Sequence, residues 1–295
     1  MFYLKRKLEN KFISLELDEN GAQLTSIKNK NNQLEYLWQG NDNFWKRQAP
    51  NLFPIVGKLK DNEFEYENNK YSMGQHGFAR DSKFEINEID DNKIIFELDS
   101  NADTKLIYPF DFKLLIKYEL INNEIDVNYK VKNLGSNKMY FSIGAHPGFN
   151  VPIENENFDD YEIKFSSKNN LNRILLKDGL SELNQPVKFD DKDSLKVKRS
   201  LFKDDAFILD SGINQDYEIS LTNSKNSHGI ILHSYNHRYL GIWSMYPKES
   251  PFVCIEPWWG IADNVDSNKQ LTEKVGINIL DKNELFESNF KIEIL

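Results

Sequence analysis

Two histidines and one glutamate have the side chains that general acid–base catalysis needs. His76 lies between two glycines in residues 74–80, and His146 lies in a second turn rich in glycine and proline. Glu256 directly follows four apolar residues, where desolvation would raise the pKa of its carboxyl toward the range of a useful base. Together the three predict an acid–base site, whereas each alone is open to a structural or a solvent-exposed role.

Aromatic and acidic residues near these positions could bind a small polar ligand. Trp258 and Trp259 come just after Glu256, and flat amphipathic rings beside a carboxylate can form the wall of a pocket, with core packing as the alternative. Asp204 and Asp205 precede an apolar segment. They are interpreted as solvated loop charges or as acceptors for ligand hydroxyl groups.

Three basic residues could contact an anion. Arg47, Lys58 and Arg80 offer this contact, and an arginine fork suits a carboxylate or a phosphate, although each could also form a surface ion pair. The chain lacks a phosphate-binding loop, a dinucleotide fingerprint and a serine nucleophile elbow. These absences disfavour nucleotide-dependent and serine-hydrolase chemistry.

The remaining histidines give no strong metal motif. His233 and His237 are four residues apart, which on a helix would place two ligands on one face, but here they flank an expected hairpin connection. No glutamate directly follows His233, and His228 lies in a polar turn. We therefore expect no metal site.

The elements that must position these side chains are strands. Apolar residues alternate with mostly polar ones over residues 112–120 and again over 125–131, which predicts a long antiparallel hairpin around Asn122 and Asn123. Further strand pairs are expected at 64–66 with 71–73, 84–86 with 94–96, and 229–232 with 240–245. Residues 194–202 are ambiguous between strand and short helix, and the polar stretch 166–200 is expected to form loops or an excursion.

Successive hairpins without alternating helices predict an all-β fold with few short helices, built from antiparallel sheets in a sandwich or a barrel. No linker or internal repeat divides residues 1–295, so we expect a single domain.

Composition limits the partners and the location. The net charge is −9 and basic residues are scattered among acidic ones, which disfavours binding to nucleic acid or to an anionic membrane. The single cysteine, Cys254, cannot form an internal disulfide and suits a reducing compartment. No signal peptide or long apolar span is evident, so a cytoplasmic protein, monomer or homodimer, is expected.

Four segments of the chain resemble the aldose 1-epimerases, or galactose mutarotase-like proteins, and most closely their LacX-type branch. The resemblance is carried by residues 49–57, 74–80, 144–149 and 255–258, in this order. It covers nearly the whole chain, and four motifs in the family's order are specific. It implies a large antiparallel β-supersandwich with a sugar site in a cleft on one sheet.

The resemblance also implies roles for individual residues. Glu256 matches the family's general base, His146 its general acid, and His76 the second histidine that holds the sugar. The acidic residue that binds sugar hydroxyls falls at Asp204 or Asp205, and the family's spacing to a following aromatic residue prefers Asp204.

Basic positions depart from the family pattern. Lys58 stands where typical galactose mutarotases have an arginine, so a bidentate contact to the sugar would be lost there unless Arg47 replaces it. Arg80 resembles an arginine that contacts phosphate in the related hexose-6-phosphate epimerases. The substrate is therefore open between a free sugar and a sugar phosphate.

The implied activity interconverts the α and β anomers of a hexose or hexose phosphate by acid–base ring opening and closure, without metal or other cofactor. One alternative is a non-catalytic carbohydrate-binding or sensing protein with the same cleft. Another is a glycoside hydrolase that uses Glu256 with Asp204 or Asp205 as two opposed carboxylates.

Overall fold

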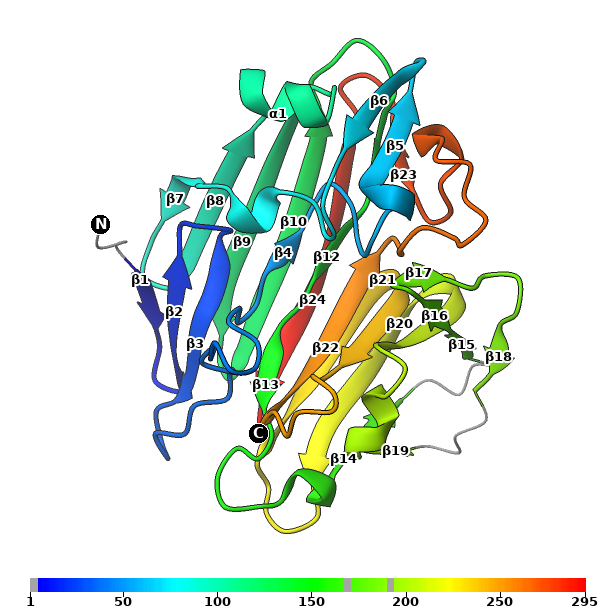
Figure 1. Cartoon of the computed structure of the whole chain (residues 1–295). Helices are drawn as coiled ribbons and strands as arrows, with labels where there is room; N and C mark the ends of the chain where they lie inside the picture. Colours follow the sequence, from blue (N-terminus) through cyan, green and yellow to red (C-terminus); the bar gives the residue numbers. More distant parts are fainter. Residues whose placement is uncertain (1–4, 167–170, 190–193) are drawn as a thin grey trace.

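Antiparallel strands make up most of the structure, which confirms the predicted all-β class (Figure 1). The computed structural model describes residues 5–166, 171–189 and 194–295. Among these residues, the α-helix α1 (Ala102–Ile107) is short, as expected, and the other helical segments are 3-10 turns of three or four residues. No helix in the described part is long and apolar enough to cross a bilayer.

Fifteen of the described strands join in one large sheet. Its main path runs β18 (Val187–Lys188), β15 (Asn172–Ile174), β20 (Phe207–Asn223), β21 (Gly229–Trp243), β24 (Leu285–Ile294), β10 (Glu124–Asn133), β9 (Phe112–Ile121), β8 (Lys93–Asp99) and β7 (Glu85–Ile89). Off this path lie β22 (Phe252–Trp259), β12 (Ile143–Ala145), β13 (Gly148–Asn150), β4 (Asn51–Leu52), β14 (Tyr161–Phe165) and β19 (Ser194–Lys196).

Smaller antiparallel sheets pack around this one. They comprise β1 (Arg6–Glu9), β2 (Ile13–Asp18) and β3 (Gln23–Asn29); β5 (Glu63–Tyr66) with β6 (Asn69–Ser72); β11 (Met139–Phe141) with β23 (Asn278–Leu280); and β16 (Leu176–Lys177) with β17 (Leu180–Ser181).

The long hairpin predicted from alternation is confirmed as β9 and β10. Ile121 pairs with Glu124 across a two-residue turn, and Asn122 takes a left-handed φ of 56° that asparagine tolerates. Every second side chain of β9 is buried, as the sequence period requires. The hairpins expected near residues 64–73 and 84–96 are also present, as β5 with β6 and β7 with β8.

The prediction of two strands at 229–232 and 240–245 was wrong. One continuous strand, β21, spans both segments, and the expected connection forms its middle. Asn236 has a left-handed φ of 57°, and the register against β20 shifts near this point. The polar residues of this segment resemble a turn in sequence, but two of them, Ser234 and His237, are buried within the strand.

The polar stretch 166–200 contains only short elements where it is described, β15 to β19 and the start of a 3-10 turn at Arg199–Phe202. The ambiguous segment 194–202 is thus a three-residue strand followed by that turn. Residues 167–170 and 190–193 lie outside the described part of the chain.

Strand β22 positions the candidate site. All eight of its residues are buried, and it pairs with β21 on one side and with β12 and β13 on the other (Figure 1). Nearby, the Asn51 side chain in β4 donates to the carbonyls of Gly21 and Ala22 and accepts a 2.6 Å hydrogen bond from the Tyr129 hydroxyl. These bonds fix the segment that leads from β4 to Gly57 at the site.

Candidate active site

A cavity of about 290 Å³ opens beside the middle of β22. Its polar lining includes Glu256, His146 and His76, the three residues that the sequence singled out, together with Gln75, Arg80 and Asp205. Three tryptophans, Trp45, Trp243 and Trp258, also line it. Aromatic walls with a few convergent polar groups are typical of a small-ligand site.

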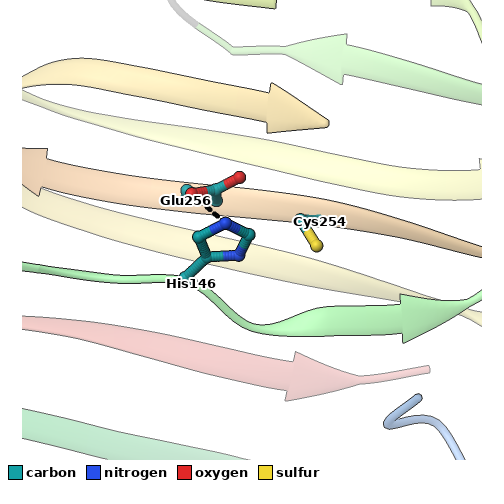
Figure 2. Close-up of side chains that lie close together, drawn as sticks. All are labelled: His146, Cys254 and Glu256. Atoms are coloured by element: carbon teal, nitrogen blue, oxygen red, sulfur yellow. Dashed lines mark ion pairs between the residues drawn. The ribbon is translucent and has the colours of Figure 1, made fainter. Parts of the chain in front are cut away.

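Glu256 is the most buried acidic group of the cavity. Its residue is 1% exposed, and its Oε2 lies 3.2 Å from His146 Nε2 (Figure 2). Burial, and secondarily the charge of Asp205, raises the pKa of the Glu256 carboxyl well above its usual value. The resting carboxyl is therefore protonated at a pH where an exposed glutamate is ionised.

His146 lies in the connection from β12 to β13, where its backbone N–H donates to the Pro50 carbonyl at 3.1 Å. Burial lowers the pKa of the imidazole to about 3, and the charges of Arg80 and Arg47 act in the same direction. The resting ring is therefore neutral. With Glu256 protonated, the pair holds one proton over a 3.2 Å contact, and that proton can lie on either partner.

His76 is held in one tautomer by the backbone. The backbone N–H of His76 donates to the Gly57 carbonyl at 2.8 Å, and the backbone N–H of Gly57 donates to the ring nitrogen His76 Nδ1 at 3.1 Å. Because Nδ1 accepts this bond, the proton of the neutral ring must be on Nε2. Burial, followed by the charges of His146, Arg80 and Arg47, lowers the pKa of His76 well below its usual value, so the ring is a neutral donor.

The turn that carries His76 requires glycine at one of its two flanking positions. Gly77 has a φ of +70°, and a Cβ there would lie 2.2 Å from the Phe53 carbonyl oxygen. At Gly74, by contrast, an added Cβ would meet no described atom within 4 Å, and the φ is not positive. The strained left-handed His76, with a φ of 68°, thus depends on the following glycine.

We expect Gly77→Ala to lower the free energy of unfolding by about 2 to 5 kcal/mol, because the new methyl group meets a backbone carbonyl that side-chain motion cannot clear. The matched variant Gly74→Ala should change it by less than about 0.5 kcal/mol. Urea unfolding followed by tryptophan fluorescence measures both. Equal stability of the two variants would contradict this view of the turn.

The structure places Asp205, and not the preferred Asp204, at the cavity. Asp205 has a left-handed φ of 76°, and its Oδ1 accepts a hydrogen bond from the Ala206 N–H at 2.8 Å. The Asp204 side chain is 63% exposed and lies 3.8 Å from the Lys203 ammonium. The preference for Asp204 comes from a count along the sequence, which does not register the left-handed backbone at residue 205.

Only one of the three proposed cations lines the cavity. Lys58 donates from Nζ to the Asp178 carbonyl at 3.1 Å and is absent from the lining, so the structure does not support a sugar contact there. Arg47 makes a bidentate ion pair with Asp81, at 2.9 and 3.1 Å, and is also absent from the lining. The expectation that Arg47 replaces a lost arginine contact is therefore not supported.

Arg80 does reach the cavity. One of its terminal nitrogens, Nη2, donates to the Gln75 carbonyl at 2.6 Å, whereas its buried Nε has no hydrogen-bond partner among the described residues. The buried indole Nε1 of Trp258 has no partner at hydrogen-bond distance in the described chain, but Trp258 acts on Glu256 to lower the pKa of that carboxyl. The Arg80 Nε lies 3.7 Å from the Asp81 carboxylate, so its charge is already partly balanced within the protein.

Sequence reasoning missed Trp45, Trp243 and Gln75. The Trp45 ring stacks on His146 with centroids 4.9 Å apart, and Trp243 meets the same imidazole nearly perpendicularly at 5.8 Å. Trp45 is separated from His146 by about a hundred positions, and no local pattern connects them. The one signal in the sequence was that Trp45 is an aromatic residue directly before the basic residues Lys46 and Arg47.

Three groups of side chains in the described residues could approach a metal ion. The first is His146, Cys254 and Glu256, which overlaps the acid–base pair (Figure 2). Cys254 and Glu256 are two positions apart on β22, so both point to the same face. Burial raises the pKa of the Cys254 thiol, which therefore rests in the neutral form rather than as the thiolate that metals prefer.

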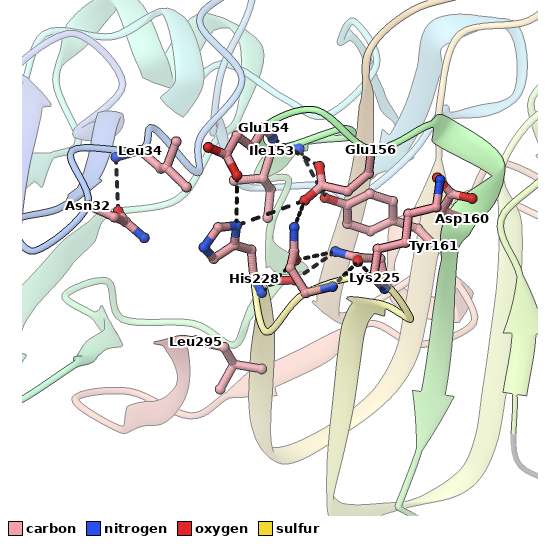
Figure 3. A network of polar contacts seen from close by, with 12 residues as sticks. Asn32, Leu34, Ile153, Glu154, Glu156, Asp160, Tyr161, Lys225, His228 and Leu295 are labelled. Atoms are coloured by element: carbon pink, nitrogen blue, oxygen red, sulfur yellow. Dashed lines mark hydrogen bonds and ion pairs between the residues drawn. The ribbon is translucent and has the colours of Figure 1, made fainter.

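The other two groups are already engaged with protein partners. His233 has a glutamate beside each ring nitrogen, Glu218 at 3.1 Å and Glu293 at 3.0 Å. In the third group, which contains Glu154, Glu156 and His228, the Glu156 carboxylate accepts hydrogen bonds from the Tyr161 hydroxyl and from the Glu154 N–H (Figure 3). Both are best understood as structural networks between strands and loops.

His237 lies away from the cavity and is fully buried. Its Nε2 is 2.5 Å from the Tyr217 hydroxyl and 3.3 Å from Ser234 Oγ. Burial lowers its pKa to about 3. The unfolded chain binds a proton on this ring near pH 6.5 and the folded chain does not, so the ring makes folding less favourable as the pH falls from 7 toward 3.

The free energy of unfolding of the wild-type chain should fall between pH 7 and pH 5. We expect this fall to be about 2 kcal/mol smaller in His237→Gln. Urea unfolding at the two pH values gives the difference for each protein. The absolute stability of the variant is not diagnostic, because the smaller side chain also leaves a cavity. An unchanged difference between the two pH values would show that His237 is not the group responsible.

Comparisons with known proteins agree on one family. A sequence model described as Aldose 1-epimerase matches residues 5–283. Two forms of protein LacX from Lactococcus lactis subsp. lactis, chromosomal and plasmid, are each 32% identical over 299 aligned positions, which cover 98% of this chain and 99% of the relative.

Solved structures agree. The galactose mutarotase related enzyme from Lactobacillus acidophilus superposes with a TM-score of 0.96 at 37% identity, covering 99% of this chain and 97% of that chain. A galactose mutarotase-like protein from Lactobacillus casei superposes with a TM-score of 0.93 at 30% identity, covering 99% of this chain and 100% of that chain.

Proposed function

Because this chain belongs to the aldose 1-epimerase family, we propose that it interconverts the α and β anomers of a hexose or hexose phosphate. The observation that carries the proposal is the 3.2 Å contact between Glu256 and His146 at the wall of a polar cavity. A carboxyl and an imidazole that share one proton can accept and donate protons at two oxygens of one sugar.

The reaction begins from the form in which Glu256 is ionised and His146 is protonated. The Glu256 carboxylate takes the proton of the anomeric hydroxyl while His146 gives its proton to the ring oxygen, and the bond from C1 to that oxygen breaks. The open aldehyde rotates about C1 to C2. On closure His146 takes the proton back and Glu256 returns one to the carbonyl oxygen, so the pair ends as it began.

Other lining residues would hold the sugar. His76 presents an Nε2–H donor, since Nδ1 is occupied by the Gly57 N–H. Asp205 can accept hydrogen bonds from hydroxyl groups, and the ring of Trp258 can pack against a face of the sugar. A cavity of about 290 Å³ lies at the low end of ligand sites and suits a monosaccharide.

Arg80 bears on the choice between a free and a phosphorylated sugar. Its guanidinium is the cation that lines the cavity in the described part of the chain, and its Nε–H has no hydrogen-bond partner there. A guanidinium suits a phosphate as a bidentate partner, and here its Nη2 is bonded to the Gln75 carbonyl while its Nε lies 3.7 Å from the Asp81 carboxylate. Arg80 therefore makes a hexose phosphate one of the two substrate forms to test within the proposed class.

Exchange NMR between anomers tests the proposal. The rates for glucose, galactose and their 6-phosphates would be measured with the wild-type protein and with Glu256→Gln as the control. Acceleration that depends on Glu256 supports the epimerase, and acceleration confined to the phosphates supports an anion site at Arg80. No acceleration of any of these four sugars would overturn the proposed hexose epimerase.

One observation favours a second candidate, a non-catalytic sugar-binding protein. Lys58 stands where the family has an arginine, and its ammonium bonds to the Asp178 carbonyl outside the cavity. The loss of one sugar contact would lower turnover, but the cleft could still bind a sugar. Binding of a sugar by calorimetry without anomer exchange would select this candidate.

The proposal includes the cellular setting. We place the protein in the cytoplasm as a monomer or homodimer that forms one domain over residues 1–295 and needs no cofactor. Its net charge of −9 fits a small-molecule substrate better than nucleic acid or an anionic membrane. Size-exclusion chromatography with light scattering would measure the oligomeric state.

A further inference from the structure

Three aromatic rings surround the imidazole of His146. His76 and Trp243 meet it nearly perpendicularly, at interplanar angles of 84° and 78°. Trp45 lies almost parallel to it, at 30°, with the ring centroids 4.9 Å apart. Among the described ring contacts of His146, Trp45 alone stacks on the face of the imidazole.

The position of Trp45 is fixed by several contacts. Its carbonyl accepts hydrogen bonds from Trp38 Nε1 at 2.7 Å and from the Asn41 N–H at 3.1 Å. Its ring also stacks on Phe252 at 5.5 Å. A Cβ at Gly148 would come within 3.0 Å of the Trp45 ring, so the glycine leaves the space in which that ring lies. The stack on His146 is therefore a built feature of the site.

The proposed reaction needs His146 to be protonated in a place that disfavours a cation. The ring is buried, and Arg80 and Arg47 add repulsion. Glu256 is the counter-ion at one edge of the ring, but it gives no support to the ring face. An indole presents a negative face, which attracts a cation most strongly when water is excluded.

We propose that Trp45 is a positioning residue that stabilises the protonated form of His146 through a cation–π contact and so promotes ring opening. This inference rests on the proposed epimerase function for its catalytic consequence. Its physical core, a Trp45 face that favours the imidazolium, does not depend on turnover. The two can therefore be tested separately.

The test replaces Trp45 with tryptophan that carries one, two or three fluorine atoms, inserted at that position by nonsense suppression. Fluorine weakens the negative face with little change in shape, so packing is retained while the cation–π contact fades. The same residues at position 38 provide the matched control. Trp38 belongs to the same aromatic cluster, and no ring contact between it and His146 is found in the described structure.

Two readouts are expected to change together. The apparent pKa of His146, followed by ¹⁵N chemical shifts of the ring, should fall progressively with fluorination at position 45, because the protonated form loses support. For the anomer exchange, kcat should fall by about threefold to thirtyfold over the series, with KM changed less than about twofold. The series at position 38 should alter neither.

The outcomes separate the two proposals. A graded fall of the His146 pKa without any anomer exchange by the wild-type protein would support the cation–π contact and reject the epimerase function. No graded change of the His146 pKa at position 45, or the same change at position 38, would overturn the role of Trp45. Unchanged kcat beside a falling pKa would show that the contact exists but does not assist the reaction, which also rejects the proposal as stated.

Discussion

Glu256→Gln is expected to lower kcat for anomer exchange at least about a hundredfold and to leave the fold intact. Glutamine has the shape of the protonated carboxyl that the buried site favours, but it cannot take a proton from the anomeric hydroxyl. The amide keeps the size of the carboxyl at the 3.2 Å contact between Oε2 and His146 Nε2, and it can still donate or accept a hydrogen bond there. Exchange NMR measures kcat, and circular dichroism checks the fold.

The stability of this variant gives an independent check with a definite sign. The folded-state pKa of Glu256 is raised above the value in the unfolded chain, so its contribution is present below about pH 4.5 and is lost as the pH rises. Glutamine does not titrate. Glu256→Gln should therefore be at least as stable as the wild type at pH 7, measured by urea unfolding. At pH 4 the difference in free energy of unfolding between the variant and the wild type should be less favourable to the variant.

Two results would contradict the role of Glu256. Near wild-type kcat in the variant would remove it as the base. A large loss of stability at pH 7 would show that its carboxyl makes a structural contact as an anion, contrary to the burial that raises its pKa. A low kcat with unchanged or higher stability is the expected signature of a site that trades stability for function.

Much of the fold was readable from the sequence because its signals are local. The β9 and β10 hairpin follows from strict alternation and a turn of two asparagines, and both are properties of adjacent residues. The galactose mutarotase-like fold that the resemblance implied is confirmed by the solved relatives. The prediction of a break inside β21 was wrong. A polar segment with a left-handed asparagine resembles a turn in the sequence, whereas neighbouring strands hold it in the sheet.

The site was readable in part. Glu256, His146 and His76 come together at one cavity from three distant segments, as their chemistry and the resemblance indicated. The differences concern which side chains line the cavity. Asp205 lines it and Asp204 does not, and the Lys58 ammonium is hydrogen-bonded to the Asp178 carbonyl.

The tryptophan that stacks on His146 could not be found from sequence. Its place depends on pairing between β13 and β22 and on a glycine that leaves room for its ring, and these are contacts between residues far apart in the chain. Spacing arguments work for residues on one element. A stacked pair from two elements needs the tertiary structure.

His146→Gln is expected to lower kcat at least about a hundredfold, with a smaller effect on KM. The amide can fill much of the space of the ring, but it cannot deliver a proton to the ring oxygen of the sugar. The partner Glu256 also loses the group 3.2 Å away with which it shares a proton. Exchange NMR gives kcat and KM, and a variant with wild-type kcat would show that another acid serves the ring oxygen.

The double variant Glu256→Gln with His146→Gln shows whether the two residues act as one unit. Independent contributions would multiply to a loss of about ten-thousandfold or more, since each single variant loses at least about a hundredfold. Residues that exchange one proton do not add in this way, because removing either one already disables the transfer that the other completes. We therefore expect the double variant to be within about tenfold of the slower single variant. A fully multiplicative loss would mean that Glu256 and His146 act on the sugar separately, and that their 3.2 Å contact has no part in the reaction.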